Sequence, residues 1–200
     1  YDLWGFEDLM LLTMDQPDLV RYACERFLRA AIHSVHEQAL AGAEGFWIEE
    51  CMTDMLSPEA YAEFNLPFLR ELVAAIRAVG RKSVFYYCGN PDDRWDLLLE
   101  GGADALALEE SKKGWRVDIE EAAKRVGGRC ALLGNLDAMQ LLAHGSEAEL
   151  RAEIARQIAA GNRNGRRFIV SLGSPVTPET PVARVRLYCD LAHALGGTGG

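Results

Sequence analysis

Polar or ionisable side chains follow five short apolar runs of this sequence. They are Glu49 and Glu50, Cys88 with Asn90, Glu109 and Glu110, Asn135 with Asp137, and Ser174. Carboxylates clustered in a partly dry site raise one another's pKa, so they can act as general acid or base near neutral pH. A cysteine thiolate can instead bind a soft metal ion, although a catalytic zinc site takes three protein ligands.

From these residue types we predict a role for each side chain. Glu109, Glu49, Asn135 and Ser174 are the predicted catalytic residues. Tyr86, Asn90 and Asp137 are predicted to bind the substrate, and Cys88 is a metal ligand only if zinc is bound. These roles require the five runs to end at one common edge.

The apolar runs are predicted to be strands that alternate with helices. The strands cover residues 45–50, 83–90, 104–110, 130–137 and 168–175, and the helices cover residues 18–42, 57–80, 95–100, 118–127, 146–160 and 181–195. We expect Pro67 to kink or break its helix. Alternation of this kind indicates parallel βα units with right-handed crossovers. The apolar stretch that opens the first strand further suggests a parallel sheet that is covered on both faces.

Five such units are too few for an eight-stranded barrel. The chain is either an open five-stranded α/β sheet or the last five or so units of a TIM-type (β/α)8 barrel, and we favour the second because it starts at Tyr1 without a methionine. Residues 1–200 are thus expected to form one domain, the C-terminal part of a longer barrel. Its first strand would then have an unpaired edge.

Composition narrows the classes of partner. A formal net charge of −9 with a pI near 5.0 argues against binding to nucleic-acid phosphates. No apolar run is long enough to cross a bilayer. The five cysteines are dispersed, odd in number and without a CxxC pair, which predicts reduced thiols in a cytoplasmic protein.

Several stretches resemble the uroporphyrinogen decarboxylase family, which in its broad sense includes the corrinoid-dependent methyltransferases that deliver methyl groups to coenzyme M. They are Leu56-Ser57-Pro58-Glu59, Tyr86-Tyr87-Cys88-Gly89-Asn90, Gly102-Ala103-Asp104-Ala105-Leu106, Leu133-Gly134-Asn135-Leu136-Asp137, and Phe168-Ile169-Val170 through Thr180-Pro181. Gly-Asn-Leu-Asp is the most specific of these. The resemblance implies a TIM-type barrel with a tetrapyrrole-facing mouth. It also implies that the substrate-gripping arginines and the catalytic aspartate of the decarboxylases lie in an earlier portion.

The sequence also departs from this family. Its methyltransferases bind zinc through a His-x-Cys element and a later cysteine. Tyr86 stands at the histidine position and Ser174 at the second cysteine, so Cys88 is the one ligand kept. The decarboxylases have a histidine near Ser174, which is absent here, and Glu109 takes the place of the family's aspartate.

Three functions follow as expectations. The first is decarboxylation of a porphyrinogen side chain, for which no cofactor is needed. The second is corrinoid-dependent methyl transfer, with zinc or a corrinoid as cofactor and a corrinoid protein as partner. The third is a catalytically silent binding module. The expected ligand is a tetrapyrrole or another small molecule. We expect no binding to nucleic acid or membrane, and the protein could form a homodimer.

Overall fold

The computed structural model describes residues 3–110 and 114–197. The strands are β1 (Gly45–Cys51), β2 (Lys82–Cys88), β3 (Ala105–Leu108), β4 (Ala131–Leu133) and β5 (Phe168–Ile169). The helices are α1 (Phe6–Asp15), α2 (Pro17–Leu40), α3 (Pro58–Phe64), α4 (Leu66–Ala78), α5 (Trp95–Glu100), α6 (Ile119–Val126), α7 (Glu147–Asn162) and α8 (Val182–Gly196), with short turns η1 (Thr53–Met55) and η2 (Ala138–Leu142).

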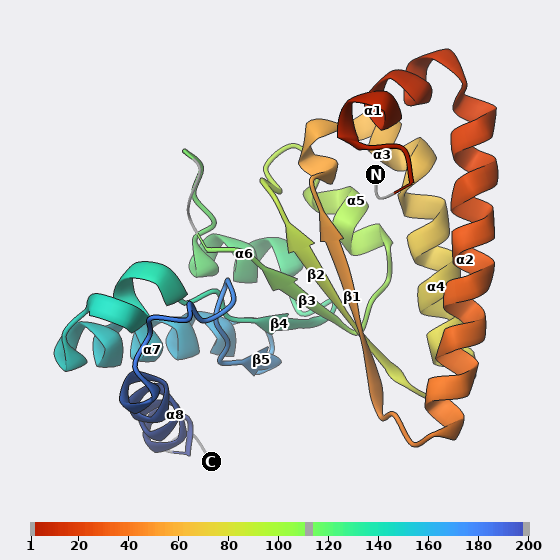
Figure 1. Ribbon diagram of the computed structural model, residues 1–200. Helices are drawn as coiled ribbons and strands as arrows, with labels where there is room; N and C mark the ends of the chain where they lie inside the picture. The colour runs from red at the N-terminus through yellow and green to blue at the C-terminus, as the bar shows by residue number, and fades with distance from the viewer. Residues whose placement is uncertain (1–2, 111–113, 198–200) are drawn as a thin grey trace.

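The strands form one parallel sheet in the order β1-β2-β3-β4-β5 (Figure 1). This confirms the α/β prediction of successive parallel βα units. The predicted break near Pro67 is also confirmed, because α3 ends at Phe64 and α4 starts at Leu66. Strands β3 to β5 are shorter than predicted, and the polar tips therefore lie on the loops that follow them.

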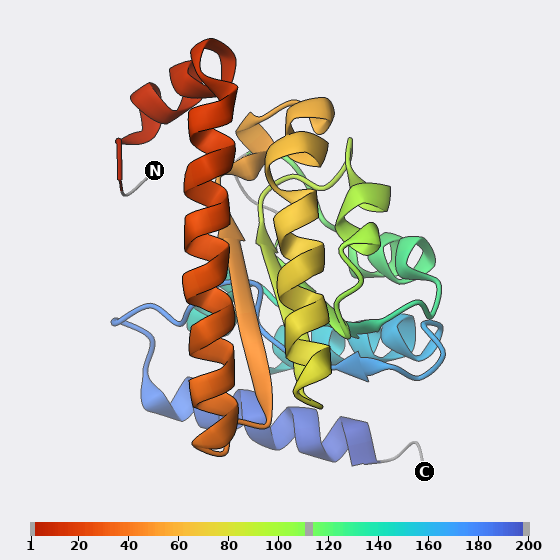
Figure 2. The ribbon, with the colours of Figure 1, turned by 90° about the vertical axis from the view of Figure 1, so that its right-hand side faces the viewer.

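Helices cover the outer face of the sheet. Phe85, Tyr87, Leu106 and Leu132 from the central strands pack against residues of α4, α5 and α6 in the main core. On β1, Phe46 packs against Val35 and Ile76, and Figure 2 shows α2 and α4 side by side over this strand. A second core joins η2, α7 and α8.

The inner face of β1 is open among the described residues. Trp47 alternates with the buried Phe46 and is 53% exposed. The expectation that both faces of this strand are covered was therefore wrong for the described part of the chain. The expected free edge is present, because β1 pairs with β2 and with no other described strand.

Local capping signals fix where the helices begin. Ser57 and Asp118 accept hydrogen bonds from the first turns of α3 and α6, and Ser146 forms a capping box with Glu149 at the start of α7. Among the described residues, no helix is both long and apolar enough to cross a membrane.

Removal of the Ser146 cap should weaken α7. Ser146→Ala leaves the N–H of Glu149 without its side-chain acceptor, so we expect a loss of about 1 kcal/mol in the free energy of unfolding, measured by urea denaturation. Ser34→Ala in the middle of α2 is the control and should cost nothing comparable, because alanine is the better helix former there. Equal losses in both variants would contradict the capping role.

Candidate active site

The carboxyl ends of the five parallel strands meet at one edge, which we call the mouth. Cys51 and Cys88 end β1 and β2 there as direct register partners. The segments that follow β4 and β5 stay together beyond the strands, because Leu136 bridges Leu172. Parallel topology therefore brings the predicted polar tips to the same side of the sheet.

The inner, concave face of the sheet forms the floor of the mouth. Tyr86, Ala105, Ala107 and Leu133 are buried there, with Cys88 partly buried beside them. The ring of Trp47 tilts against that of Tyr86, with 5.3 Å between the ring centroids. The small residues Ala105 and Ala107 of β3 belong to this apolar surface, and the polar groups lie around it.

Three side chains from β1 and β2 form a compact cluster, which we call the thiol cluster: Glu49, Cys51 and Cys88. Their carboxylate oxygen and sulfur atoms all lie within 4.8 Å of one another. The Cys51 thiol donates to Glu49 Oε1 at 3.4 Å. Burial, followed by the nearby Cys88 thiol and Glu49 carboxylate, raises the pKa of Cys51 to about 12.

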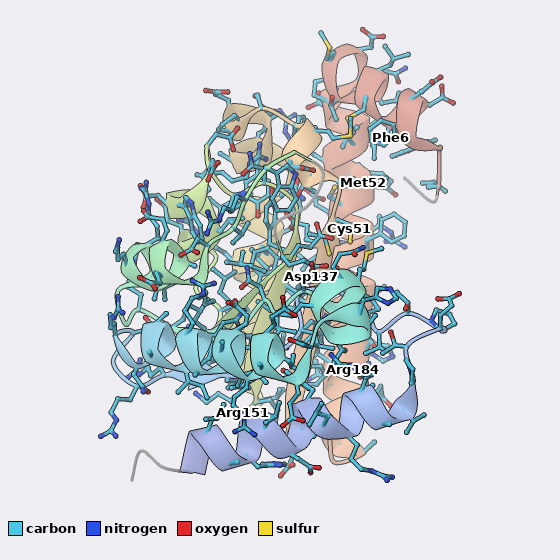
Figure 3. All side chains as sticks on the ribbon, turned by 90° about the vertical axis from the view of Figure 1, so that its left-hand side faces the viewer. Phe6, Cys51, Met52, Asp137, Arg151 and Arg184 are labelled. Atoms are coloured by element: carbon cyan, nitrogen blue, oxygen red, sulfur yellow. The ribbon has the colours of Figure 1, made fainter. Side chains whose placement is uncertain are left out.

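Cys51 was not among the residues predicted from the sequence. Alternation along β1 puts it on the same face as Glu49, and the register puts it opposite Cys88. The sequence contained the first signal, a Glu-x-Cys spacing at a strand end, but only the pairing of β1 with β2 supplies the second. Figure 3 shows Cys51 and Met52 at the end of this strand.

Tyr86 and Ser174, which the resemblance places at two metal-ligand positions of the methyltransferases, have other contacts in the structure. The Tyr86 hydroxyl donates to the Gly173 carbonyl at 2.7 Å, and the Ser174 hydroxyl donates to Glu110 Oε2 at 2.8 Å. Burial raises the pKa of Tyr86 well above its usual range. A neutral phenol hydrogen-bonded to a carbonyl is a poor metal ligand, so the family's His-x-Cys and Cys set does not fit these residues.

Glu109 lies in the mouth close to the thiol cluster. It is 6% exposed. The pKa of the Cys88 thiol is raised mainly by burial and further by the Glu109 and Glu49 carboxylates. Glu109 also contributes to the raised pKa of Tyr86. Its carboxyl group is therefore close enough to influence both side chains, and its catalytic role stays a prediction.

Asn135 holds the loop that follows β3. Its side-chain amide donates to the carbonyls of Glu109, at 3.2 Å, and Val117, at 2.7 Å. Its own backbone N–H donates to Gln157 Oε1 at 3.3 Å. The residue is 5% exposed, so these contacts make it a positioning residue for Glu109, while its catalytic role stays a prediction.

Asn90 and Asp137 have local structural roles at the mouth. Asn90 Oδ1 accepts the N–H of Asp92 at 3.1 Å, which closes a turn. Asp137 Oδ1 accepts the N–H groups of Met139 and Gln140, both at 2.8 Å, and so caps η2, which is a π-helix. Their predicted contacts with substrate remain predictions.

Glu50 lies apart from the other acids. It faces the helices, where its carboxylate accepts from the Thr53 hydroxyl at 2.7 Å. Burial is the main cause that raises its pKa, and the Thr53 hydrogen bond works in the opposite direction. Alternation along β1 separates Glu50 from Glu49, so Glu49 is the acid of this pair that faces the mouth side.

A buried arginine supports the loop between β1 and α3. Arg94 is 2% exposed, and its guanidinium donates to the carbonyls of Thr53, at 2.7 Å, and Leu56, at 2.8 Å. It also bonds Asp93 and lies 5.4 Å from the centre of the Tyr61 ring. Sequence analysis missed this residue, because a lone arginine in a polar loop carries no signal of burial.

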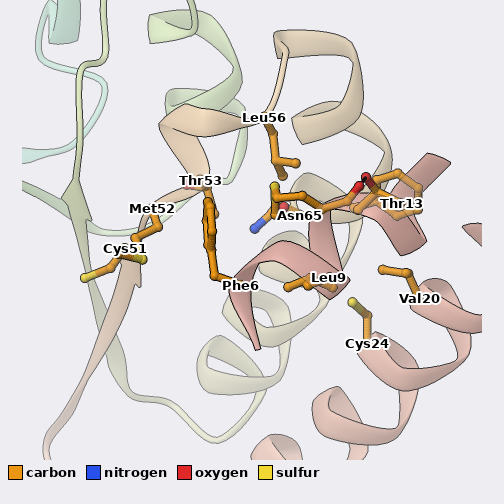
Figure 4. A pocket seen from close by; sticks show the side chains of 12 residues that line it. Phe6, Leu9, Thr13, Val20, Cys24, Cys51, Met52, Thr53, Leu56 and Asn65 are labelled. Carbon is orange, nitrogen blue, oxygen red and sulfur yellow. Dashed lines mark hydrogen bonds between the residues drawn. The ribbon is translucent and has the colours of Figure 1, made fainter. Parts of the chain in front are cut away.

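An apolar cavity of about 230 Å³ adjoins the thiol cluster. It lies between α1, α2 and the loop after β1, and Figure 4 shows Cys51 at one edge and Cys24 on the opposite side. Its walls include Phe6, Leu9 and Leu56. The cavity offers space for an apolar group near Cys51.

Comparison with known proteins decides the family. The profile of the uroporphyrinogen decarboxylase (URO-D) family matches residues 3–195. The chain belongs to the URO-D family. It is similar to the uroporphyrinogen decarboxylases of Azotobacter vinelandii (31% identity), Pseudomonas putida strain GB-1 (30%) and Hahella chejuensis (28%), each over 193 residues that make up 95% of this chain and 52% of the relative.

The URO-D chain also shares its fold with a methyltransferase from Methanosarcina mazei. The TM-score is 0.81 at 21% identity, and the similarity covers 95% of this chain and 53% of the other. The chain therefore spans about half the length of the relatives it matches. The profile match over residues 3–195 confirms the resemblance to the URO-D family.

Proposed function

We propose that this URO-D protein is an enzyme that acts on a tetrapyrrole at the mouth. The first candidate reaction is decarboxylation of an acetate side chain of a porphyrinogen. The observation that carries the proposal is the buried Glu109 beside the apolar floor. Similarity to uroporphyrinogen decarboxylases over 193 residues supports it.

The decarboxylation needs one positioned acid. Glu109, in its protonated form, donates a proton to the pyrrole ring, which becomes an electron sink. The bond between the side-chain carbon and the carboxylate then breaks, the electron pair moves into the ring, and carbon dioxide leaves. A proton is then added to the side-chain carbon, the ring returns its extra proton to the Glu109 carboxylate, and no electrons are exchanged with a cofactor.

The test is release of carbon dioxide from uroporphyrinogen by the full-length protein. Glu109→Gln keeps the size of the side chain but removes the acid, so kcat should fall at least about 100-fold. Glu100→Gln is the control, because Glu100 is an exposed partner of Arg70 and should leave the rate unchanged. Full activity of Glu109→Gln would remove this residue from the mechanism.

The second candidate reaction is corrinoid-linked methyl transfer, and the thiol cluster is the observation that favours it. A zinc ion held by thiolates would supply a Lewis acid that deprotonates an incoming thiol. The cluster would hold that ion, and Trp47 and Tyr86 would form the apolar floor beside it. Turnover of a methylcobamide with a thiol acceptor, lost on chelation of zinc, distinguishes this reaction from decarboxylation. No turnover with either substrate class would leave the binding module.

A further inference from the structure

The thiol cluster contains a set of metal-binding atoms that is not the family's set. Glu49, Cys51 and Cys88 each offer one ligand atom, and these atoms lie within 4.8 Å of one another. The family's positions at Tyr86 and Ser174 are engaged in hydrogen bonds with Gly173 and Glu110. Two of the three clustered residues therefore come from β1, where the resemblance gave no ligand.

The geometry of the two paired strands places these three side chains on one face of the sheet. Glu49 and Cys51 are two residues apart in β1, so they point to the same side of the sheet. Cys88 is the register partner of Cys51 on the neighbouring strand. The chain turns sharply at Met52, whose φ of 66° is left-handed, so Cys51 is the last residue of the strand. Regular strand geometry, rather than flexible loops, supports the cluster.

The distances suit a tetrahedral ion with little movement. Zn–S bonds of about 2.3 Å and Zn–O bonds of about 2.1 Å give ligand separations of about 3.6–3.8 Å across a tetrahedron. Cys51 Sγ and Glu49 Oε1 are 3.4 Å apart, close to that separation. The largest separation allowed in the cluster, 4.8 Å, needs to shrink by about 1 Å, which a change of side-chain torsion can supply.

The types of ligand select the metal. Two thiolates exclude magnesium and calcium, which take oxygen ligands, and a carboxylate beside them suits zinc. Three protein ligands leave the fourth position for water or a substrate, as in catalytic zinc sites. We propose that Glu49, Cys51 and Cys88 form a zinc site with one open coordination position at the mouth.

The proposed zinc site rests on the geometry of the thiol cluster and does not depend on which reaction the enzyme performs. Glu109, the proposed acid, is not one of the ligands. If the protein transfers methyl groups, the open position could receive the thiol acceptor. Only this catalytic use of the zinc site rests on the proposed function. The adjoining cavity at Cys51 could hold an apolar part of that thiol.

Metal binding is tested directly on the full-length protein in reducing buffer. Because the site has three protein ligands, we expect about one zinc per chain in the purified protein. Protein loaded with Co²⁺ should show a thiolate-to-cobalt charge-transfer band. Cys51→Ser and Cys88→Ser should each weaken Zn²⁺ binding at least about 100-fold, since loss of even a supporting residue costs 10–100-fold. Glu49→Gln should also weaken binding but retain the charge-transfer band.

Cys24→Ser is the matched control, because Cys24 borders the same cavity but lies outside the thiol cluster. It should bind Zn²⁺ as the parent does, and circular dichroism should show all variants folded. Absence of stoichiometric zinc, or a Cys51→Ser variant that binds as tightly as the parent, would overturn the site. Zinc binding without turnover would support the zinc site and count against the proposed function. Turnover by protein that takes up no zinc would support the proposed function and overturn the zinc site.

Discussion

Arg94→Ala is expected to lower the free energy of unfolding by about 3–5 kcal/mol, the cost typical of removing one partner of a buried ionic and hydrogen-bonded group. The variant removes the guanidinium donor from the carbonyls of Thr53 and Leu56 and opens a space beneath Tyr61. Denaturation by guanidinium chloride, compared with the parent protein, measures this loss.

Arg70→Ala is the matched control for this prediction. Arg70 is half exposed and pairs with Glu100 at 2.7 Å, so its removal should cost no more than about 1 kcal/mol. Arg94→Lys should fall between the two, because a lysine keeps the charge but cannot reach both carbonyls with a planar fork. If Arg94→Ala and Arg70→Ala lose the same stability, the buried guanidinium does not hold the loop after β1.

Gly173→Ala is expected to destabilise the mouth by about 2–4 kcal/mol, from steric overlap and weakened hydrogen bonds. An added Cβ would lie 2.4 Å from the backbone nitrogen of Glu110, a distance at which backbone must shift. That shift would disturb the Tyr86 hydrogen bond to the Gly173 carbonyl and the Ser174 contact with Glu110. Thermal and chemical denaturation measure the effect.

Gly196→Ala provides the comparison, because nothing lies within 4 Å of a Cβ added at this end of α8. It should be neutral or slightly stabilising, since alanine is favoured over glycine in a helix. Unchanged stability in Gly173→Ala would show that the segments after β3 and β5 are not closely packed at this glycine.

The order of strands and helices could be predicted from the sequence because apolar runs, proline and capping residues act locally. Ser57, Asp118 and Ser146 each mark a helix start that the structure confirms. The ends of β4 and β5 could not be predicted, because an apolar residue, Leu136, recurs soon after β4 and because Ile169 is followed by Val170 and Leu172. The point at which strand pairing stops depends on contacts with residues elsewhere in the chain.

The site was predictable in part. Parallel topology brings Cys88, Glu109 and Ser174 to one edge, as their positions after strands indicated. Cys51 could not be added without the register between β1 and β2, and the contact of Ser174 with Glu110 joins residues 64 positions apart. Contacts over such sequence separations depend on the tertiary structure.

The hydrogen bond from Tyr86 to the carbonyl of Gly173 joins residues that are 87 positions apart and passes over the two strands between them. This tie, a hydrogen bond across the curved sheet, restrains changes in the curvature of the sheet. Cys88 lies two residues further along the strand that carries this tie. A displacement of the segment after β5, such as a bound molecule would cause, would therefore be transmitted through Tyr86 to Cys88 on the same face of the sheet.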